Sequence, residues 1–351
     1  MEHRLSIFSF LLLSLIFSLV SCGGGGSASP PSSSQPSSPV FTNYHLTGDT
    51  SQVRDPSIIR QGTTYYQFGT DIGVPVGGSL PIRCSTDRVA WTAYGFVLNQ
   101  IPAWVLNKVP GIVGLWAPDI SFFNGLYHVY YAGSTFGSNT SVIGLVTNTT
   151  LDQTNPNYQW VDQGEVLGSI SSDDFNALDP TILVDADSTV WMTYGSYWTG
   201  IKQQQIDPVT GMLLASNPTV YSLAERPNVQ FDPIEGTSLV HKGSFYYLFA
   251  SFDNCCASNP YQGTYRIMVG RGTSPHGPFT DMDGIDMLQG GGTQLLAGNG
   301  TTWNAPGGGT VYLDSQNGDT IVFHALHLPD GAAFLFVNPV TWPDDWPQIQ
   351  P

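Results

Sequence analysis

The sequence predicts an all-β protein folded as a five-bladed β-propeller. A unit of one strand, a tight turn and an aromatic-rich second strand recurs five times, with its heads at 55, about 117–119, 179, 235 and about 307. Each period of roughly 60 residues leaves room for two further strands. Glycine (39) and proline (25) are abundant, and beyond the N-terminal apolar run no segment shows a helical pattern. A β-sandwich pair would not explain this repeat, and a β-helix would need a much shorter one.

The N-terminus carries the features of an export signal. Arg4 precedes an apolar run over 5–20, which is too short for a convincing membrane span. The run ends in Leu19-Val20-Ser21-Cys22, which resembles the lipobox of bacterial lipoproteins. We therefore predict a signal peptide over 1–21, lipidation at Cys22, a Gly/Ser/Pro-rich linker over 22–40 and the propeller over 41–351. Such a protein would be exported and anchored to a bacterial membrane, at the cell surface or in the periplasm. An ordinary secretory signal with a chance cysteine is the alternative.

The blades are predicted in chain order from alternating apolar runs and turn residues. The expected strands are 55–59, 65–69, 80–85 and 91–97; then 116–123, 127–132, 141–147 and 159–166; then 179–184, 190–196, 202–206 and 219–223; then 235–240, 246–251, 265–270 and 287–288; and finally 305–312 and 321–325. The first strand of each propeller blade lines the central axis, so the strand heads are expected to face a common funnel.

Charge limits the class of partner. The net charge is −16 and the isoelectric point is near 4.4. An acidic surface repels polyanions, which excludes nucleic acid and disfavours an acidic polysaccharide. A neutral ligand is expected, and we expect the protein to be a monomer.

Three carboxylates stand at strand heads, in Asp55-Pro56, Asp179-Pro180 and Glu235-Gly236. Either Asp-Pro alone would usually be a turn starter, but glutamate is depleted in strands. Three acids in one funnel raise one another's pKa and cost stability, so their shared phase in the repeat indicates a function. Glycoside hydrolysis and binding of a hard cation are the two chemistries that suit such a cluster.

Several motifs then resemble glycoside hydrolase family 43. They are Val53-Arg54-Asp55-Pro56-Ser57-Ile58, Trp116-Ala117-Pro118-Asp119-Ile120, Leu178-Asp179-Pro180-Thr181, the run 194–201 and Ile234-Glu235-Gly236. Within the family, Phe252-Asp253-Asn254-Cys255-Cys256, the following run 265–271 and the run 290–293 before Leu295-Leu296 are similar to endo-acting α-1,5-L-arabinanases. The resemblance covers roughly residues 43–346.

The resemblance implies hydrolysis with inversion on a neutral plant cell-wall arabinan. It makes Asp55 the general base, Glu235 the general acid and Asp179 the residue that orients Glu235 and raises its pKa. This assignment agrees with electrostatics, because a neighbouring carboxylate disfavours a second negative charge and keeps a general acid protonated. Among the same motifs, Trp116 and Tyr197 are expected to contact sugar and Ser196 to hydrogen-bond a sugar hydroxyl, with core packing as the alternative for each.

The resemblance also implies a calcium ion near His324, commonly reached through water, and no organic cofactor. A satisfied core histidine is the alternative for His324. Some relatives have a histidine after the Pro-Gly of Ala305-Pro306-Gly307-Gly308, where this chain has glycine. A metal ligand from this loop is therefore in doubt.

Besides Cys22, three cysteines remain, and no spacing indicates zinc. Cys255 and Cys256 can form a vicinal disulfide, which would leave Cys84 as a buried thiol.

The alternatives to an endo-arabinanase keep the fold and change the substrate or the mode of attack. They are an exo-arabinanase, an α-L-arabinofuranosidase and a β-xylosidase, and a non-catalytic surface glycan-binding propeller is a further one. We expect the loops over 71–80, 100–115 and 254–263 to decide among the enzymes, because an open groove admits a polymer and a closed pocket only a chain end.

Overall fold

The structure is a computed structural model that describes residues 45–256 and 259–350. The predicted signal peptide, Cys22, the whole predicted linker and its boundary with the propeller lie outside these residues, so those expectations stay predictions. In the part of the chain that is described, no helix combines the length and apolarity that a membrane crossing requires.

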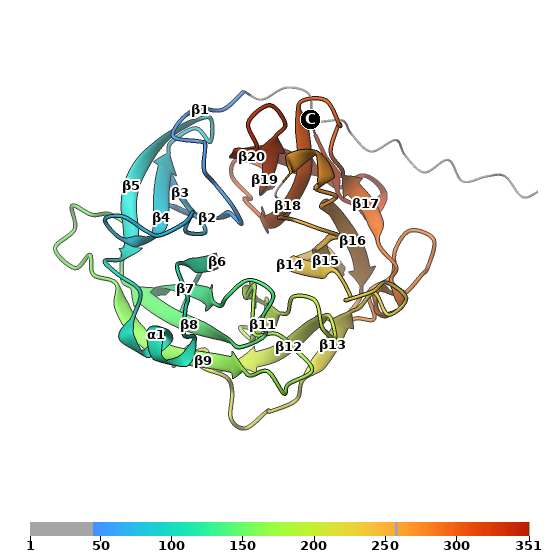
Figure 1. The fold of residues 1–351 in the computed structure, drawn as a ribbon, viewed down its shortest axis with the longest axis horizontal. Coiled ribbons are helices and arrows are strands. Elements are labelled where there is room, and N and C mark those ends of the chain that lie inside the picture. Colours follow the sequence, from blue (N-terminus) through green and yellow to red (C-terminus); the bar gives the residue numbers. More distant parts are fainter. Residues whose placement is uncertain (1–44, 257–258, 351) are drawn as a thin grey trace, which may run out of the picture. The chain divides into compact units, whose positions relative to one another are not determined.

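Five antiparallel sheets stand around a common axis, which confirms the predicted five-bladed propeller (Figure 1). The blades consist of β2 (Ser57–Gln61), β3 (Thr64–Phe68), β4 (Ser79–Ser85) and β5 (Ala90–Leu98); β6 (Leu115–Phe123), β7 (Leu126–Gly133), β8 (Ser141–Asn148) and β9 (Val161–Ser169); β10 (Thr181–Val184), β11 (Val190–Tyr194), β12 (Ile201–Ile206) and β13 (Tyr221–Ala224); β14 (Ile234–Lys242), β15 (Phe245–Phe252), β16 (Arg266–Gly272) and β17 (Thr293–Leu296); and β18 (Trp303–Tyr312), β19 (Thr320–His327), β20 (Ala333–Thr341) and β21 (Gln348–Ile349). Within every blade the strands follow in chain order from the axis outward.

Two expectations about local structure are wrong. The predicted strand at 287–288 is a 3-10 turn, η2 (Met287–Gln289), because the Asp286 side chain accepts a hydrogen bond from the Leu288 N–H and caps it. The fourth strand of that blade is β17 instead. A helix, α1 (Ala103–Lys108), occurs where none was expected. Six residues are too few to display a helical period, and burial of Val105 among apolar side chains stabilises it. Two further 3-10 turns are η1 (Pro260–Gln262) and η3 (Pro343–Asp345).

Residues 47–53 tie the last blade to the first. The strand β1 (Thr47–Gly48) runs parallel to β5 at the outer edge of the first blade. A few residues later, Thr50 O accepts a hydrogen bond from Leu335 N at 2.8 Å, and Val53 N donates to Ala333 O at 3.2 Å. One short segment therefore bonds to both the first and the fifth blade and closes the ring.

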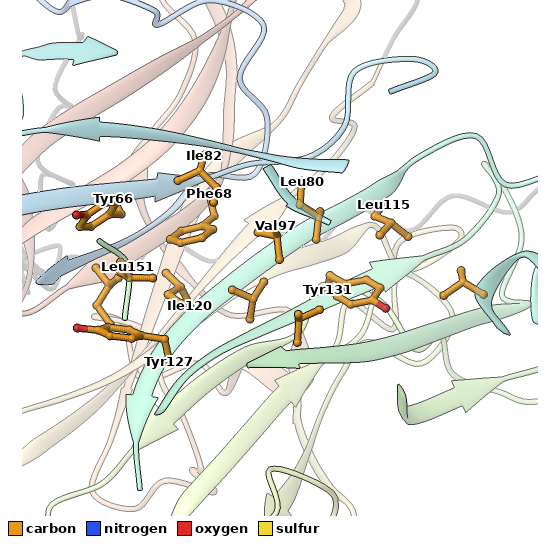
Figure 2. Close-up of a cluster of buried hydrophobic side chains, with 14 of the residues drawn as sticks. Tyr66, Phe68, Leu80, Ile82, Val97, Leu115, Ile120, Tyr127, Tyr131 and Leu151 are labelled. Atoms are coloured by element: carbon orange, nitrogen blue, oxygen red, sulfur yellow. The ribbon is translucent and has the colours of Figure 1, made fainter. Parts of the chain in front are cut away.

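The core lies between neighbouring blades. Figure 2 shows the contact of the first two blades, where side chains of both blades form one apolar cluster. Tyr66, Phe68 and Ile82 of the first blade belong to it together with Ile120 and Tyr127 of the second. Faces of adjacent sheets pack in this way all around the axis, and the packing makes the strand heads a rigid frame for a site.

The blade heads share a backbone conformation. A residue with a left-handed φ recurs at one position of each head, namely Asp55 (46°), Ala117 (43°), Asp179 (52°), Gly236 (57°) and Gly308 (56°), and the fifth blade has a second one, Ala305 (48°). The ladders of β6, β14 and β18 also shift register at this place, as bulges do. A left-handed non-glycine residue is strained, and such strain concentrates at functional sites.

This conformation corrects one detail of the predicted repeat. Gly236 holds the position equivalent to Asp55 and Asp179, so Glu235 precedes the equivalent position by one residue. Asp55 and Asp179 consequently reach the funnel from the same position of the repeat, and Glu235 reaches it from the position before.

Candidate active site

A cavity of about 790 Å³ opens at the strand heads. Its lining includes all three predicted acids and all three predicted sugar-contact residues: Asp55, Asp179, Glu235, Trp116, Ser196 and Tyr197. The structure therefore brings together residues that are spread over 180 positions of the sequence, from 55 to 235.

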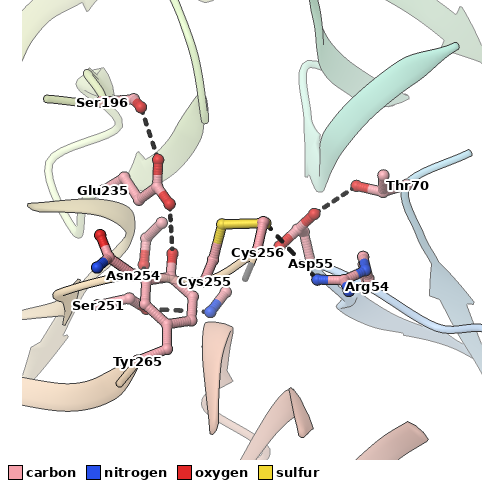
Figure 3. Close-up of a disulfide and its surroundings, with 12 residues drawn as sticks. Arg54, Asp55, Thr70, Ser196, Glu235, Ser251, Asn254, Cys255, Cys256 and Tyr265 are labelled. Atoms are coloured by element: carbon pink, nitrogen blue, oxygen red, sulfur yellow. Dashed lines mark hydrogen bonds between the residues drawn. A yellow bond between two sulfur atoms is a disulfide. The ribbon is translucent and has the colours of Figure 1, made fainter. Parts of the chain in front are cut away.

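Two side chains hold Glu235 (Figure 3). Ser196 Oγ donates to Glu235 Oε2 at 2.6 Å, and Tyr265 Oη donates to Glu235 Oε1 at 3.1 Å. Both carboxylate oxygens thus have a donor, which fixes the plane of the group. Burial raises the pKa of Glu235 to about 7, repulsion by Asp55 adds to the rise, and the two hydrogen bonds oppose it. A carboxyl group with this pKa retains a proton near neutrality.

Asp55 is held by side chain and backbone. Thr70 Oγ1 donates to Asp55 Oδ2 at 2.6 Å, and the Asp55 N–H donates to His324 Nδ1 at 3.2 Å. Burial raises the pKa of Asp55, whereas the Thr70 hydrogen bond and the positive charge of Arg54 lower it. Thr70 Oγ1 also accepts a hydrogen bond from Ala117 N at 2.8 Å, so one hydroxyl links the heads of the first two blades.

Asp179 is hydrogen-bonded to the backbone of Gly236, the residue that follows Glu235. Its Oδ2 accepts a hydrogen bond from Gly236 N at 3.0 Å. Burial raises the pKa of Asp179 well above its usual range, and repulsion first by Glu235 and then by Asp55 raises it further. Because the charge of Glu235 contributes to this rise, the titration of Asp179 depends on the protonation state of Glu235.

The predicted sugar-contact residues differ in how they are held. Trp116, in β6, is half-buried at the cavity wall. Tyr197 has a left-handed φ of 58°, and its hydroxyl donates to Asn254 Oδ1 at 3.3 Å. Ser196 is buried, and its hydroxyl donates a hydrogen bond to Glu235. It lines the cavity as a partner of the acid, and its contact with a sugar stays a prediction.

Sequence reasoning missed three residues of the site, Tyr265, Thr70 and Arg54, although Arg54 and Tyr265 both lie within motifs of the resemblance. Tyr265 is buried, and an added Cβ on Gly307 would lie only 1.9 Å from Tyr265 Cδ1. The glycine run 307–309 therefore makes room for the tyrosine ring. Only the spatial contact with Glu235 distinguishes Tyr265 from the other aromatic residues of the sheets.

The site near His324 allows a test of the predicted calcium ion. His324 is 1% exposed, and burial holds its pKa well below the usual value, so the ring is neutral. Because Nδ1 accepts the Asp55 N–H, the ring proton is on Nε2, which is buried and has no hydrogen-bond partner among the described residues. These groups fit an ion reached through water, and they do not fit direct ligation by Nε2.

Nothing else near His324 completes a protein-built ion site. Within 45–256 and 259–350, no group of three or more His, Cys, Asp or Glu side chains is suited to hold a metal. A Cβ on Gly308 would lie 2.3 Å from Asp55 Oδ1, which explains why this chain has no side chain there.

Apolar side chains surround the mouth of the cavity. Phe136 is 79% exposed and Phe231 is 74% exposed, and both line it with Ile72 and Trp198. Of the three loops predicted to shape the mouth, 71–80 and 254–263 contribute lining residues. The loop 100–115 contributes none, because it folds into α1 and packs against the sheet.

Cys255 and Cys256 form a disulfide that lines the same cavity. Cys84 carries a free thiol, and it is half-buried where full burial was expected.

Comparison with known proteins identifies the family of the chain. Residues 49–347 match the profile of the glycosyl hydrolases family 43. The chain is 38% identical to the extracellular endo-α-(1→5)-L-arabinanase 1 of Bacillus subtilis (strain 168), over 84% of this chain and 87% of that protein. It is 36% identical to the extracellular exo-α-(1→5)-L-arabinofuranosidase ArbA of Cellvibrio japonicus, over 85% and 86%. The structure of a Cellvibrio cellulosa α-L-arabinanase in complex with arabinohexaose superposes with a TM-score of 0.78 at 35% identity, covering 86% of this chain and 96% of that one.

Proposed function

The chain belongs to glycosyl hydrolases family 43 and is a glycoside hydrolase, and from this premise we propose that it cleaves internal α-1,5-L-arabinofuranosidic bonds of arabinan with inversion. One observation carries the proposal. A single cavity holds a half-buried Glu235 whose pKa is about 7, together with Asp55 and Asp179. The similarity to relatives named as arabinanases supports the choice of arabinan.

In the proposed reaction, ionised Asp55 takes a proton from a water molecule whose oxygen attacks the anomeric carbon. Glu235 gives its proton to the departing glycosidic oxygen as the carbon–oxygen bond breaks. Asp55 ends protonated and Glu235 ionised, and exchange of protons with solvent restores both. Asp179 contributes by repelling negative charge from Glu235 and by holding Gly236, the next residue along the chain.

The exposed apolar rim supports endo action. Phe136 and Phe231 offer aromatic faces to sugar units beyond the one at the acids. An exo-acting relative is 36% identical, so exo-arabinanase is the second candidate.

Product analysis distinguishes the candidates. The purified domain is incubated with debranched arabinan, with an aryl arabinofuranoside and with an aryl xyloside, and product length is followed over time. We expect mixed oligosaccharides to appear first from the polymer. Release of monosaccharide alone would reject endo action, and turnover of the xyloside alone would reject arabinan as the substrate.

We include in the proposal a calcium ion contacted by His324 through water. Such an ion, when bound, supplies positive charge that favours the ionised form of Asp55. Treatment with a chelator is expected to lower activity and thermal stability, and calcium is expected to restore both. Unchanged melting and activity after chelation would contradict this part.

We also propose that the protein is an exported monomer anchored through lipid on Cys22. Two relatives named as extracellular support export. Expression in a bacterial host is expected to place the protein in the membrane fraction, and a Cys22→Ala variant in the soluble fraction. Equal partition of both would contradict the anchor.

A further inference from the structure

The disulfide of Cys255 and Cys256 lies directly after β15 and faces the cleft. Both cysteines line the cavity that holds the three acids. Cys256 is exposed and Cys255 is half-buried. In Figure 3 the two sulfur atoms lie between the side chains of Glu235 and Asp55.

Each half of the disulfide contacts a residue that supports one side of the reaction. Cys255 packs against an apolar cluster that contains Tyr265, the tyrosine that donates to Glu235. Arg54 Nη1 donates to Cys256 Sγ at 3.7 Å, and Arg54 directly precedes Asp55. The disulfide therefore connects the surroundings of the acid with those of the base, across the space where the scissile bond must lie.

A role in global stability does not account for this disulfide. In the chain-entropy description, stabilisation by a disulfide grows with the length of the loop that it closes. Cys255 and Cys256 are adjacent in the sequence, so their bond closes no loop. Because this disulfide stabilises the fold so little and lies in the cleft, its role is expected to be contact with the ligand.

The chemistry of the pair selects one part of a sugar. A disulfide has no hydrogen to donate, and its sulfur atoms are weak acceptors but polarisable. It consequently suits the C–H face of a ring better than hydroxyl groups, which find polar partners elsewhere in the cavity.

We propose that the Cys255–Cys256 disulfide is the apolar platform on which the arabinofuranose ring beside the scissile bond rests. This inference depends on the proposed substrate. The platform binds one face of the ring, and the two walls that it connects, Tyr265 with Glu235 and Arg54 with Asp55, enclose the edges.

Binding of linear α-1,5-arabinohexaose tests the platform without turnover. Its Kd is measured by calorimetry for a Glu235→Gln protein with the disulfide intact and for the same protein carrying Cys255→Ser and Cys256→Ser. We expect binding to weaken about 10-fold, which corresponds to about 1.4 kcal/mol. Cys84→Ser, which removes a cysteine outside the cavity, is the matched control and is expected to leave Kd unchanged.

Chemical reduction provides a second measurement on the folded protein. A phosphine reductant converts the disulfide into two thiols and is itself oxidised. It is expected to raise KM for the hexaose in wild type and in Cys84→Ser alike, and to leave the double serine variant unaffected. A Cys255→Ala, Cys256→Ala protein keeps an apolar surface and is expected to bind more tightly than the serine pair.

The outcomes separate the two proposals. If wild type hydrolyses arabinan while the serine pair binds the hexaose as tightly as the intact site, the platform is wrong and the proposed function stands. An equal response to reductant in the serine pair would also overturn the platform. If wild type neither hydrolyses arabinan nor binds the hexaose, the proposed function fails first.

Discussion

Two regions of the propeller axis each hold a carboxyl group whose pKa is raised by burial, and they differ in what can reach this group. In the cleft, burial raises the pKa of Glu235 to about 7. Deeper along the axis, burial raises the pKa of Asp119 to about 8. Glu235 lines a cavity of about 790 Å³ and has two side-chain donors, whereas Asp119 lines one of about 20 Å³ and accepts a single hydrogen bond from Ile182 N at 3.0 Å. A raised pKa therefore does not identify a catalyst, and access to a substrate does.

The difference between Glu235 and Asp119 follows from the shared geometry of the blade heads. Asp119 lies two residues after the left-handed Ala117, and the equivalent residues of the other blades are the small hydroxyl residues Ser57, Thr181, Ser238 and Thr310. Glu235 lines only the cleft, Asp55 and Asp179 line both cavities, and Asp119, Thr181 and Thr310 line only the narrow channel. Five predictions, made on four variants, test this division.

Replacement of the acid in the cleft has the largest expected effect. Glu235→Gln keeps the size of the side chain and removes the proton that the leaving oxygen needs, so kcat should fall by about 10³-fold or more. Steady-state rates on arabinan measure it, and unchanged circular dichroism shows that the fold is intact. Glu225→Gln, outside the cavity, is the control and should retain activity. Turnover close to that of wild type would remove Glu235 from the role of acid.

The second-largest effect is expected at Gly308, whose backbone lies next to Asp55, the proposed base. Gly308→Ala would place a Cβ 2.3 Å from Asp55 Oδ1, at a φ of 56°. We expect activity to fall by about 10²-fold, since misplacement of a catalytic group by about 1 Å has this effect. Gly62→Ala is the matched control, because its φ is 60° and nothing lies within 4 Å of the added Cβ. Equal losses of activity in both variants would mean that strain alone, and no contact with Asp55, explains the result.

Loss of the neighbouring charge should change the pH profile. If Asp179 has its proposed role, Asp179→Asn removes a charge that disfavours ionisation of Glu235, so the pKa of Glu235 falls and its proton is lost at lower pH. The alkaline limb of kcat/KM, expected near pH 7 in wild type, should move to lower pH, and the rate should fall by about 10-fold. A lower rate with an unmoved limb would leave Asp179 a role in orientation alone.

The repeat made the fold and the meeting of the acids predictable. Strand heads of one phase must converge when their strands line one axis, so Asp55 and Asp179 could be placed together from their shared Asp-Pro pattern. Glu235 was placed correctly in the cleft, but its position in the repeat was wrong by one residue. The left-handed conformation that makes Gly236 the equivalent of Asp55 and Asp179 is visible only in the structure.

The partners of the acids could not be predicted. Thr70 follows β3 and Tyr265 precedes β16, and neither occupies the phase of the strand heads. Their hydrogen bonds depend on how neighbouring elements approach the heads, which no local pattern in the sequence encodes. The capped turn at η2 and the six residues of α1 were missed because neither is long enough for an apolar spacing to repeat.

The smallest expected effect on activity belongs to the acid in the channel. Asp119 is neutral below pH about 8, as is asparagine, and in an Asp119→Asn protein the amide oxygen of the new side chain can still accept from Ile182 N. Activity should therefore stay within about 2-fold of wild type at pH 6 to 7, measured as steady-state rates on arabinan. A large loss of activity with a shifted pH profile would show that the channel takes part in catalysis and would end the division between the two regions.

The free energy of unfolding of the Asp119→Asn variant, unlike its activity, should differ from that of wild type by an amount that changes with pH. The folded-state pKa of Asp119 lies above the unfolded value of 3.8, so its contribution is fully present below pH 3.8 and is lost as pH rises through about 8. Asp119→Asn removes that loss, and denaturant unfolding should show the variant gaining stability over wild type between pH 4 and 8. Asp87→Asn is a control of opposite sign, because hydrogen bonds from Ala90 N and Val89 N lower the pKa of the exposed Asp87 and its contribution is lost as pH falls. A stability difference that does not change with pH would mean that Asp119 ionises in the folded state at its unfolded pKa, and that burial does not raise this pKa.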